Sequence, residues 1–324
     1  MKYDFRFDVL RDIGLMFILL CHFVTHFDGR FASETHDIIA GGGNFVFFII
    51  SGWLLGMKWR AKGCPAYGVD FLLHCGRRIF FPLWSFLIPF SAWILISDGG
   101  WGRLLMNFAG LSWFFKIDGI GHFWFVTLIL LFYSGILFLT NMRLDVVSRK
   151  SLFALPIIIC GIFVQLLMVY AGLKQNYIMV FLILGFLFFM YGDKILNQLE
   201  KTGKVIVPVS LSVLAAACTV MVLMQDKECY CVRSWLQAVI GMSVIAIVVP
   251  WLKSEWRCSV VAWIAGISFD VYLVHSLFRY PCVVKLCPTG LVYFLVYMSG
   301  SFIVAVILRS CRMKIERLFG VRMP

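Results

Sequence analysis

The sequence has few charged residues and no polar stretch long enough to form a soluble domain. Charged residues make up only 14% of the 324 residues, against roughly 25% in soluble domains. Hydrophobic residues make up 61%, so a soluble fold of this composition would lack the polar surface that keeps a protein dissolved. The composition therefore excludes a soluble protein and predicts an integral membrane protein.

Three further features are missing: a continuous basic stripe, a zinc-type cysteine spacing and a signal-peptide cleavage site. The net charge of +12 comes from basic residues spread over short connections, so we expect no nucleic-acid partner. No metal site is expected. Because no A-x-A site follows the first apolar run, we expect that run to be retained as a helix. Whether disulfides form stays open for the cysteines of two predicted external loops, Cys229, Cys231, Cys282 and Cys287.

Ten apolar segments approach or reach the length of about 20 residues that a membrane-spanning helix needs. They predict an all-α membrane protein with about ten transmembrane helices. The stretch 101–115 is apolar but interrupted by Arg103, Asn107 and Gly110, which indicates an interfacial or re-entrant piece. The ten predicted spans are 9–27, 38–57, 79–97, 122–140, 152–172, 176–192, 205–224, 233–252, 259–279 and 290–308.

The distribution of basic residues predicts the orientation of these spans. With the N-terminus inside, the predicted cytoplasmic segments hold 21 of the 29 lysines and arginines. This excess is the positive-inside pattern of a protein with both termini in the cytoplasm. No connection is long enough for a soluble domain, so residues 1–324 are expected to form a single membrane domain.

The first predicted helix carries an arginine and a histidine on one face. Arg11 and His22 are eleven residues apart, which puts them within about 20° of one face and about 16 Å apart along the axis. Leu15 and Ile18 lie between them, and His26 continues the face. Polar side chains in a membrane helix face the protein interior or a pathway. Histidine suits proton transfer, and arginine suits an anionic group such as phosphate.

Simpler interpretations of these residues stay open. Arg11 alone also fits a topology anchor whose side chain reaches the membrane surface, and a buried histidine also fits a structural role. His22 and His26, four residues apart, would suit a metal, but no acidic residue occupies a matching position.

Residues 7–14 read FDVLRDIG and run on to His22. This stretch resembles the opening of the acyltransferase-3 family of membrane O-acyltransferases, which carries an arginine and a histidine with ten residues between them. Asp8, Arg11 and His22 fall at the matching positions, whereas Asp12 replaces the usual glycine.

Further segments resemble the same family in the expected order. They are GNFVFFIISG at 43–52, RRIFFP at 77–82, HFWF at 122–125 and ISFDVYLVH at 267–275. Many members carry an acidic residue near the start of the second motif and a glutamate after the middle tryptophan. This chain has Phe45 and the apolar run 128–132 there, so it departs from the family pattern on the substrate side.

The resemblance implies ten helices and transfer of an acyl group, usually acetyl, from cytoplasmic acyl-CoA to a hydroxyl of a surface carbohydrate or lipid-linked sugar. No bound cofactor is expected, and the implied location is the bacterial cytoplasmic membrane. We hypothesise that His22 is the general base and that Arg11, Arg77 and Arg78 bind the phosphates of the donor. The residues expected to line or support the acceptor path are Ser268, Tyr272, His275, His26 and Trp124.

Alternatives to these roles also stay open. Ser268, Tyr272 and His275 share one helix face, which fits an interhelical hydrogen-bond network equally well. Asp270 is a charge within a membrane helix, so we expect it to have a buried partner. Two other functions are considered: a transporter or flippase for a glycan or lipid-linked precursor, and a sensor or assembly subunit.

Overall fold

The computed structural model describes residues 4–24, 30–63, 67–98, 100–112, 115, 117, 121–141, 177–223, 230–287 and 289–318. These residues form helices and connections without a β-strand, which confirms the predicted all-α class for the described part of the chain. The α-helices are α1 (Phe5–Val24), α2 (Arg30–Ala61), α3 (Val69–Asp98), α4 (Trp101–Phe108), α5 (Trp124–Asn141), α7 (Tyr177–Leu223), α8 (Tyr230–Val248), α9 (Ser259–Val274), α10 (Pro281–Leu286) and α11 (Gly290–Leu318). Three short 3₁₀ helices are η1 (Gly121–Phe123), η2 (Val249–Trp251) and η3 (His275–Arg279).

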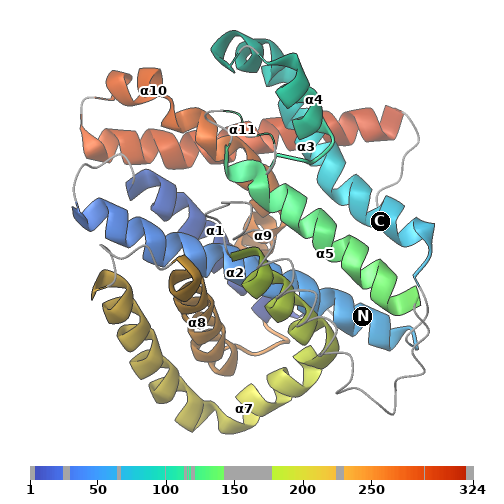
Figure 1. Ribbon diagram of the computed structural model, residues 1–324, viewed down its shortest axis with the longest axis vertical. Coiled ribbons are helices and arrows are strands. Elements are labelled where there is room, and N and C mark those ends of the chain that lie inside the picture. The colour runs from blue at the N-terminus through green and yellow to red at the C-terminus, as the bar shows by residue number, and fades with distance from the viewer. Residues whose placement is uncertain are drawn as a thin grey trace. The chain divides into compact units, whose positions relative to one another are not determined.

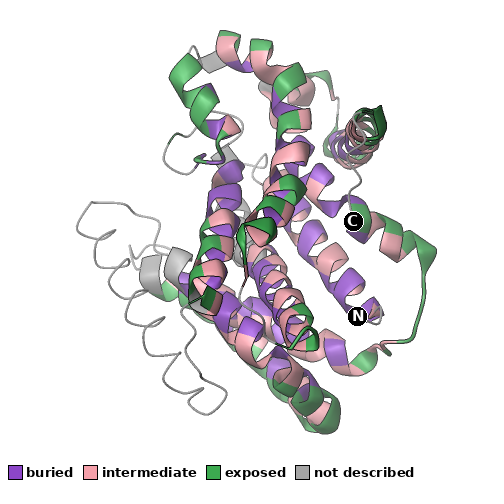
Figure 2. Cartoon of the chain, turned by 90° about the vertical axis from the view of Figure 1, so that its right-hand side faces the viewer, coloured by how far each residue is buried: buried purple, intermediate pink, exposed green. Residues whose placement is uncertain are grey.

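Five helical stretches of the described residues are long and apolar enough to cross a membrane. They are Val69–Ile96, Val180–Leu223, Val232–Trp251, Ser259–Arg279 and Gly290–Leu318. Exposed residues occur along many helices and not only at their ends (Figure 2). Among them, Ile88 is 64% exposed and Leu295 56%, as expected of side chains that face lipid. The chain is therefore a multi-pass membrane protein, whereas ten spans and cytoplasmic termini stay predictions.

Helix α7 differs most from the sequence-based expectation. We predicted two spans, 176–192 and 205–224, separated by a cytoplasmic loop, but the helix continues through that connection. The connecting residues include the good helix formers lysine, leucine, glutamine and glutamate, so they keep the helical state even where the sequence becomes polar. Figure 1 shows α7 strongly bent. Pro208 lies inside it and cannot donate a backbone hydrogen bond, which weakens the helix locally.

Other boundaries also differ from the prediction. Helix α3 begins ten residues before the predicted span at 79, and α11 continues ten residues beyond 308. The predicted interfacial stretch 101–115 begins with the short helix α4, on which Trp101 is exposed and Asn107 is buried. Hydropathy reports where the sequence stops being apolar and not where the backbone stops being helical. The predicted span 152–172 lies outside the described residues.

The chain divides into two compact units, each made of two chain segments. The first unit contains Met1–Ala66 and Phe138–Ala265, and the second contains Tyr67–Leu137 and Gly266–Pro324. One boundary between the two units, that between Ala265 and Gly266, lies within α9.

Close helix contacts hold the first unit together. A Cβ on Gly52 of α2 would collide with the backbone of Gly185 on α7, so these helices approach more closely than side chains would allow. The fully buried ring of Trp53 packs edge-on against Phe7 of α1 and also against Phe188 of α7, with both centroid distances 5.1 Å. Helices α1, α2 and α7 thus share one core, to which α8 contributes Val244 and Ile245.

A buried ion pair links two helices of the second unit. Arg312 of α11 donates hydrogen bonds to both carboxylate oxygens of Asp270 on α9, at 2.5 and 3.2 Å. This is the buried partner that we predicted for Asp270. Arg309, one turn earlier on α11, donates to the backbone carbonyl of Gly266. The two arginines therefore hold the adjoining part of α9 through polar contacts.

Candidate functional site

The arginine and histidine of α1 lie on a face that is turned toward the protein interior. Leu15 and Ile18, which separate Arg11 from His22 on that face, are 0% and 3% exposed. Arg11 and His22 themselves are half-buried. The polar groups therefore share an inward-facing stripe with buried apolar residues, as a functional role requires.

Arg11 contacts an acidic residue of its own helix. Its Nη1 donates to Oδ1 of Asp8 at 3.3 Å, and the arginine side chain stays 34% exposed. A guanidinium carries five N–H donors in a planar fork, and the partial exposure of this one makes it accessible to an anion. Asp8 and Arg11 are two of the three residues that match the family motif in this segment.

His22 lies in the last turn of α1, where a positive charge is favoured by the helix dipole. Close packing against α2 determines the position of α1. A Cβ on Gly43 would come within 2.7 Å of the carbonyl oxygen of Gly14, so the backbones are in direct contact. His26, predicted to continue the face, lies outside the described residues.

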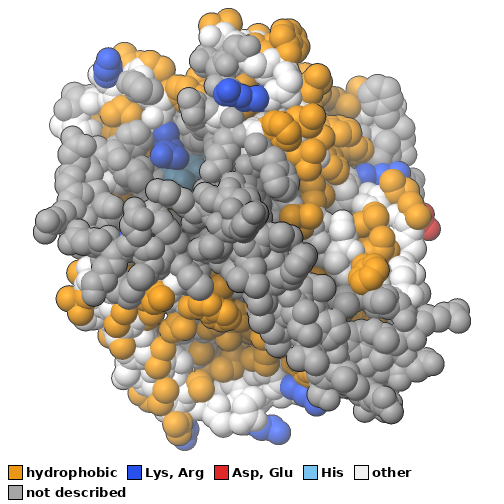
Figure 3. Space-filling model, viewed as in Figure 1, with side chains coloured by type: hydrophobic (Ala, Val, Ile, Leu, Met, Phe, Trp, Pro, Cys, Tyr) orange, Lys and Arg blue, Asp and Glu red, His pale blue; other side chains and the backbone are white. Residues whose placement is uncertain are grey.

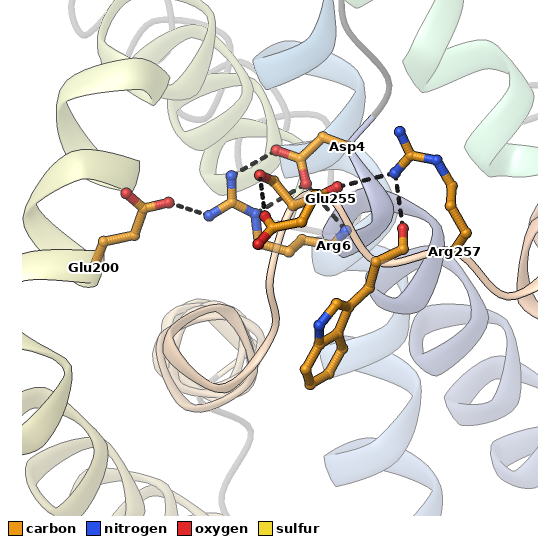
Figure 4. Close-up of polar contacts among 7 residues, drawn as sticks. Asp4, Arg6, Glu200, Glu255 and Arg257 are labelled. Carbon is orange, nitrogen blue, oxygen red and sulfur yellow. Dashed lines mark hydrogen bonds and ion pairs between the residues drawn. The ribbon is translucent and has the colours of Figure 1, made fainter.

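A polar network anchors the beginning of α1 (Figure 4). The buried guanidinium of Arg6 donates to Asp4 at 2.9 and 2.6 Å and also pairs with Glu200 of α7. Burial disfavours the charged guanidinium, but the hydrogen bonds and negative charges of Asp4 and Glu200 outweigh this, so the pKa of Arg6 is raised. The backbone N–H of Phe5 donates to the carbonyl of Ser254 at 3.2 Å.

This network joins three segments that the positive-inside pattern predicts to be cytoplasmic. Residue 6 comes from the N-terminal segment, residue 200 from the connection 192–204, and residue 254 from the connection 253–258. Arg257 adds contacts to the carbonyls of Ser254 and Trp256, at 3.2 and 2.8 Å. Their meeting at one place agrees with the prediction that they lie on one side of the membrane.

The other predicted donor-binding residues belong to the second unit. Arg77 and Arg78 lie on α3, between about two and three turns after its start at Val69, and both are exposed. Exposure makes them accessible to a soluble anion, whereas Arg11 and His22 belong to the first unit.

The predicted acceptor-side residues lie in a buried polar cluster of the second unit. Ser268, Tyr272 and His275 are 4%, 4% and 0% exposed. The Tyr272 hydroxyl donates to the carbonyl of His122, and the His122 and His275 rings lie 4.6 Å apart between centroids. Trp124, half-buried, is the first residue of α5 and follows His122 by two positions.

The hydrogen bond of His275 determines its tautomer. Nδ1 lies 2.6 Å from the backbone carbonyl of Tyr272. Because a carbonyl oxygen only accepts, Nδ1 must carry the proton, and in a neutral imidazole Nε2 then has the lone pair. His275 therefore offers a base or a hydrogen-bond acceptor at Nε2.

The turn that carries His122 is held by several side chains of the same unit. Ser112 donates to the carbonyl of Phe123, and Thr127 donates to that of Gly110 at 2.6 Å. Together with Tyr272, these bonds attach the start of α5 to both α9 and the turn after α4. Such interlocked polar groups make the arrangement rigid.

His122 is the residue of this cluster that the sequence analysis missed. It is the first residue of the segment HFWF, in which Trp124 carries the resemblance to the family. A histidine at the start of the predicted span 122–140 was a usable signal, because histidine is costly in lipid. Ser276 directly follows the motif at 267–275, and its buried hydroxyl makes no hydrogen bond with the residues that the structure describes.

Two further points concern metals and cysteines. No group of three or more histidine, cysteine, aspartate or glutamate side chains among the described residues has an arrangement suited to a metal ion. Cys282 and Cys287 are not joined in a disulfide, Cys229 lies outside the described residues, and the side chain of Cys231 is not described.

Comparison with known proteins identifies the family. The model of the acyltransferase-3 family, described as "Acyltransferase domain", matches residues 4–310, nearly the whole chain. No curated protein and no solved structure gives a significant match. The match includes the α1 stripe and the polar cluster of the second unit. The chain therefore belongs to the acyltransferase-3 family, and it is a membrane acyltransferase.

Proposed function

We propose that this protein transfers an acyl group, specifically acetyl, from cytoplasmic acyl-CoA to a hydroxyl of a cell-surface carbohydrate or lipid-linked sugar. The observation that carries the proposal is the inward-facing stripe of Arg11 and His22 in a chain of an acyltransferase family. We further propose that the protein works in the cytoplasmic membrane of a bacterium.

In this reaction His22 is the general base. A ring nitrogen of His22 takes the proton of the acceptor hydroxyl as its oxygen attacks the thioester carbonyl. A C–O bond forms, the C–S bond breaks, and the thiolate of CoA leaves and takes up a proton. A positioned base contributes roughly 10²–10⁴-fold to such a step. Transfer through a covalent acyl-enzyme is the alternative route.

Arg11, Arg77 and Arg78 bind the phosphates of the donor. Guanidinium groups form paired hydrogen bonds with phosphate, and the exposure of Arg77 and Arg78 and the partial exposure of Arg11 support this role. In the second unit, Ser268, Tyr272, His275 and Trp124 support the acceptor, and His122 joins them because its carbonyl holds the Tyr272 hydroxyl. His26 keeps its proposed place on the α1 stripe.

The experiment is transfer of a radiolabelled acetyl group from acetyl-CoA in membranes that contain the protein. Wild-type membranes should label carbohydrate, and His22→Ala should abolish labelling while the variant still elutes as a folded monodisperse protein. His74→Ala, at a half-buried histidine of α3, is the matched control and should keep activity. Full activity of His22→Ala would refute the base. A wild-type protein that moves the glycan across the membrane without labelling it would instead be a flippase.

A further inference from the structure

The two basic residue types behave differently in the first unit. Its arginines are bound to other groups: Arg6 to Asp4 and Glu200, and Arg60 through Nε to Asp193 at 2.6 Å. Its described lysines are all exposed and form no ion pair with the described residues. We call them the lysine surface, which consists of Lys58, Lys62, Lys194, Lys201, Lys204 and Lys253.

Contacts within the unit gather the lysine surface around the middle of α7. Arg60, near the end of α2, donates to the carbonyl of Phe189 and, at 3.3 Å, to that of Met190. On the other side, a Cβ on Gly203 would touch Pro250 of η2 at 2.7 Å. The end of α2 and the connection after α8 therefore both lie against α7. In Figure 3, Lys and Arg side chains lie at the lower edge of the view, where Figure 1 shows the bend of α7.

The middle of α7 is too polar to lie in the hydrocarbon of a membrane. Helix α7 has 47 residues, which at 1.5 Å per residue corresponds to about 70 Å, more than twice the roughly 30 Å of hydrocarbon in a bilayer. Its central stretch reads DKILNQLEKTGK between residues 193 and 204. The length of α7 and its polar centre are both explained if the two arms of the bent helix enter the membrane and its centre lies at the membrane surface.

The residues next to the lysine surface are those of a membrane boundary. Trp251 and Trp256 are 69% and 45% exposed, and Val205 and Val209, which follow Lys204 on α7, are 67% and 50% exposed. Tryptophan is enriched where the headgroups meet the hydrocarbon. Lysines beside exposed valines and tryptophans therefore present charge to headgroups and apolar area to acyl chains.

The negative charges of this region do not neutralise the lysines. Glu200 and Asp193 are paired with arginines, and Asp4 is buried with Arg6. The exposed carboxylate of Glu255 accepts a hydrogen bond from Ser254 at 3.3 Å. The lysine surface thus keeps a net positive charge.

We propose that the lysine surface binds the headgroups of anionic phospholipids and thereby holds the centre of α7 at the membrane surface. Clusters of basic residues beside membrane helices bind anionic lipids in this way. A soluble donor such as CoA fits less well, because lysines dispersed over an exposed surface act as separate point charges and lack the paired geometry that holds one phosphate tightly. This inference does not depend on the acyl donor, the acceptor or the role of His22.

The test uses the full-length protein in nanodiscs of phosphatidylcholine alone and of phosphatidylcholine with phosphatidylglycerol. Native mass spectrometry counts the phosphatidylglycerol molecules that stay bound, and tryptophan emission follows thermal unfolding. The wild-type protein should keep phosphatidylglycerol and unfold at a higher temperature in its presence. A variant with Lys194, Lys201, Lys204 and Lys253 changed to glutamine should bind several-fold less and lose that temperature difference.

Two control variants separate the effect of these four lysines on lipid binding from the effect of substituting lysines in general. Changing the same four residues to arginine keeps the charge, so lipid binding should persist, and this variant tests the proposal even if the glutamine variant does not fold. Lys285→Gln with Lys314→Gln alters exposed lysines of the second unit and should change neither readout. Equal phosphatidylglycerol retention by the wild-type and glutamine variants would overturn the proposal. Displacement of the lipid by soluble CoA at low salt would also overturn it, because it would assign the surface to the nucleotide.

Discussion

Arg312 of α11 donates to both carboxylate oxygens of Asp270 on α9, and the two side chains are 14% and 6% exposed. A buried carboxylate without its cation is expensive because it has left water and gained no partner. Arg312→Ala should therefore lower the free energy of unfolding by about 3–5 kcal/mol. Asp270→Asn should cost less, because Glu316, whose Oε1 lies 3.6 Å from Nε of Arg312, still faces the guanidinium. Reversible unfolding in mild detergent measures both.

The double variant provides the control for this pair. If the ion pair carries the effect, Arg312→Ala with Asp270→Asn should be more stable than the sum of the single losses, since the double variant leaves no buried carboxylate at position 270. Additive losses would show that the two residues act separately.

Gly52→Ala should strongly destabilise the protein, because the added Cβ meets the backbone of Gly185 and that backbone cannot rotate away. We expect a loss of folded protein in a thermal aggregation assay. Gly102→Ala is the matched control. A Cβ there meets nothing within 4 Å and Gly102 lies inside α4, so the exchange should stabilise the helix by up to about 1 kcal/mol. Equal behaviour of the two variants would refute the proposed close contact of α2 and α7.

Arg11→Lys should raise KM for acetyl-CoA by roughly ten-fold with a smaller change in kcat, because lysine keeps the charge but loses the planar pair of donors. The control is Arg103→Lys at an exposed arginine of α4, which should leave both constants unchanged. A fall in kcat at constant KM would mean that Arg11 acts after donor binding.

The sequence predicted the fold class and the family, because both can be recognised from short stretches of the chain. Apolar segments identify membrane helices wherever they occur, and the family motifs are local strings such as residues 7–14. The partner of Asp270 was predicted to exist but not named. A charged residue within an apolar helix shows that a partner is needed. The identity of that partner, 42 residues away, depends on how α9 and α11 pack.

The errors had the same physical origin. The connection 193–204 was expected to be a loop because it is polar, but polarity determines the environment of a segment and not its backbone conformation. His122 was missed because its importance arises from Tyr272, which lies 150 positions later. Contacts between residues far apart in the sequence can be identified only from the three-dimensional structure. The sequence alone shows only that a polar residue within an apolar segment needs a partner.

Two substitutions at His275 separate its structural bond from the function proposed for its cluster. Asparagine ends where Nδ1 of the imidazole lies, so His275→Asn can still donate to the Tyr272 carbonyl but has no atom at the Nε2 position. Glutamine reaches the Nε2 position but gives up the bond to Tyr272, which leaves a buried carbonyl without its donor and costs about 1–3 kcal/mol. Acetyl transfer and thermal unfolding are measured for both.

If Nε2 of His275 interacts with the acceptor, His275→Asn should stay as stable as the wild-type protein and lose transfer, and KM for the acceptor should rise. His275→Gln should then unfold at a lower temperature yet keep more transfer activity at low temperature, because its amide oxygen can accept the hydrogen bond that Nε2 would accept. If the cluster is only an interhelical network, the order reverses: activity follows stability, and the asparagine variant is the more active of the two. The two hypotheses thus predict opposite rankings of the same pair of proteins.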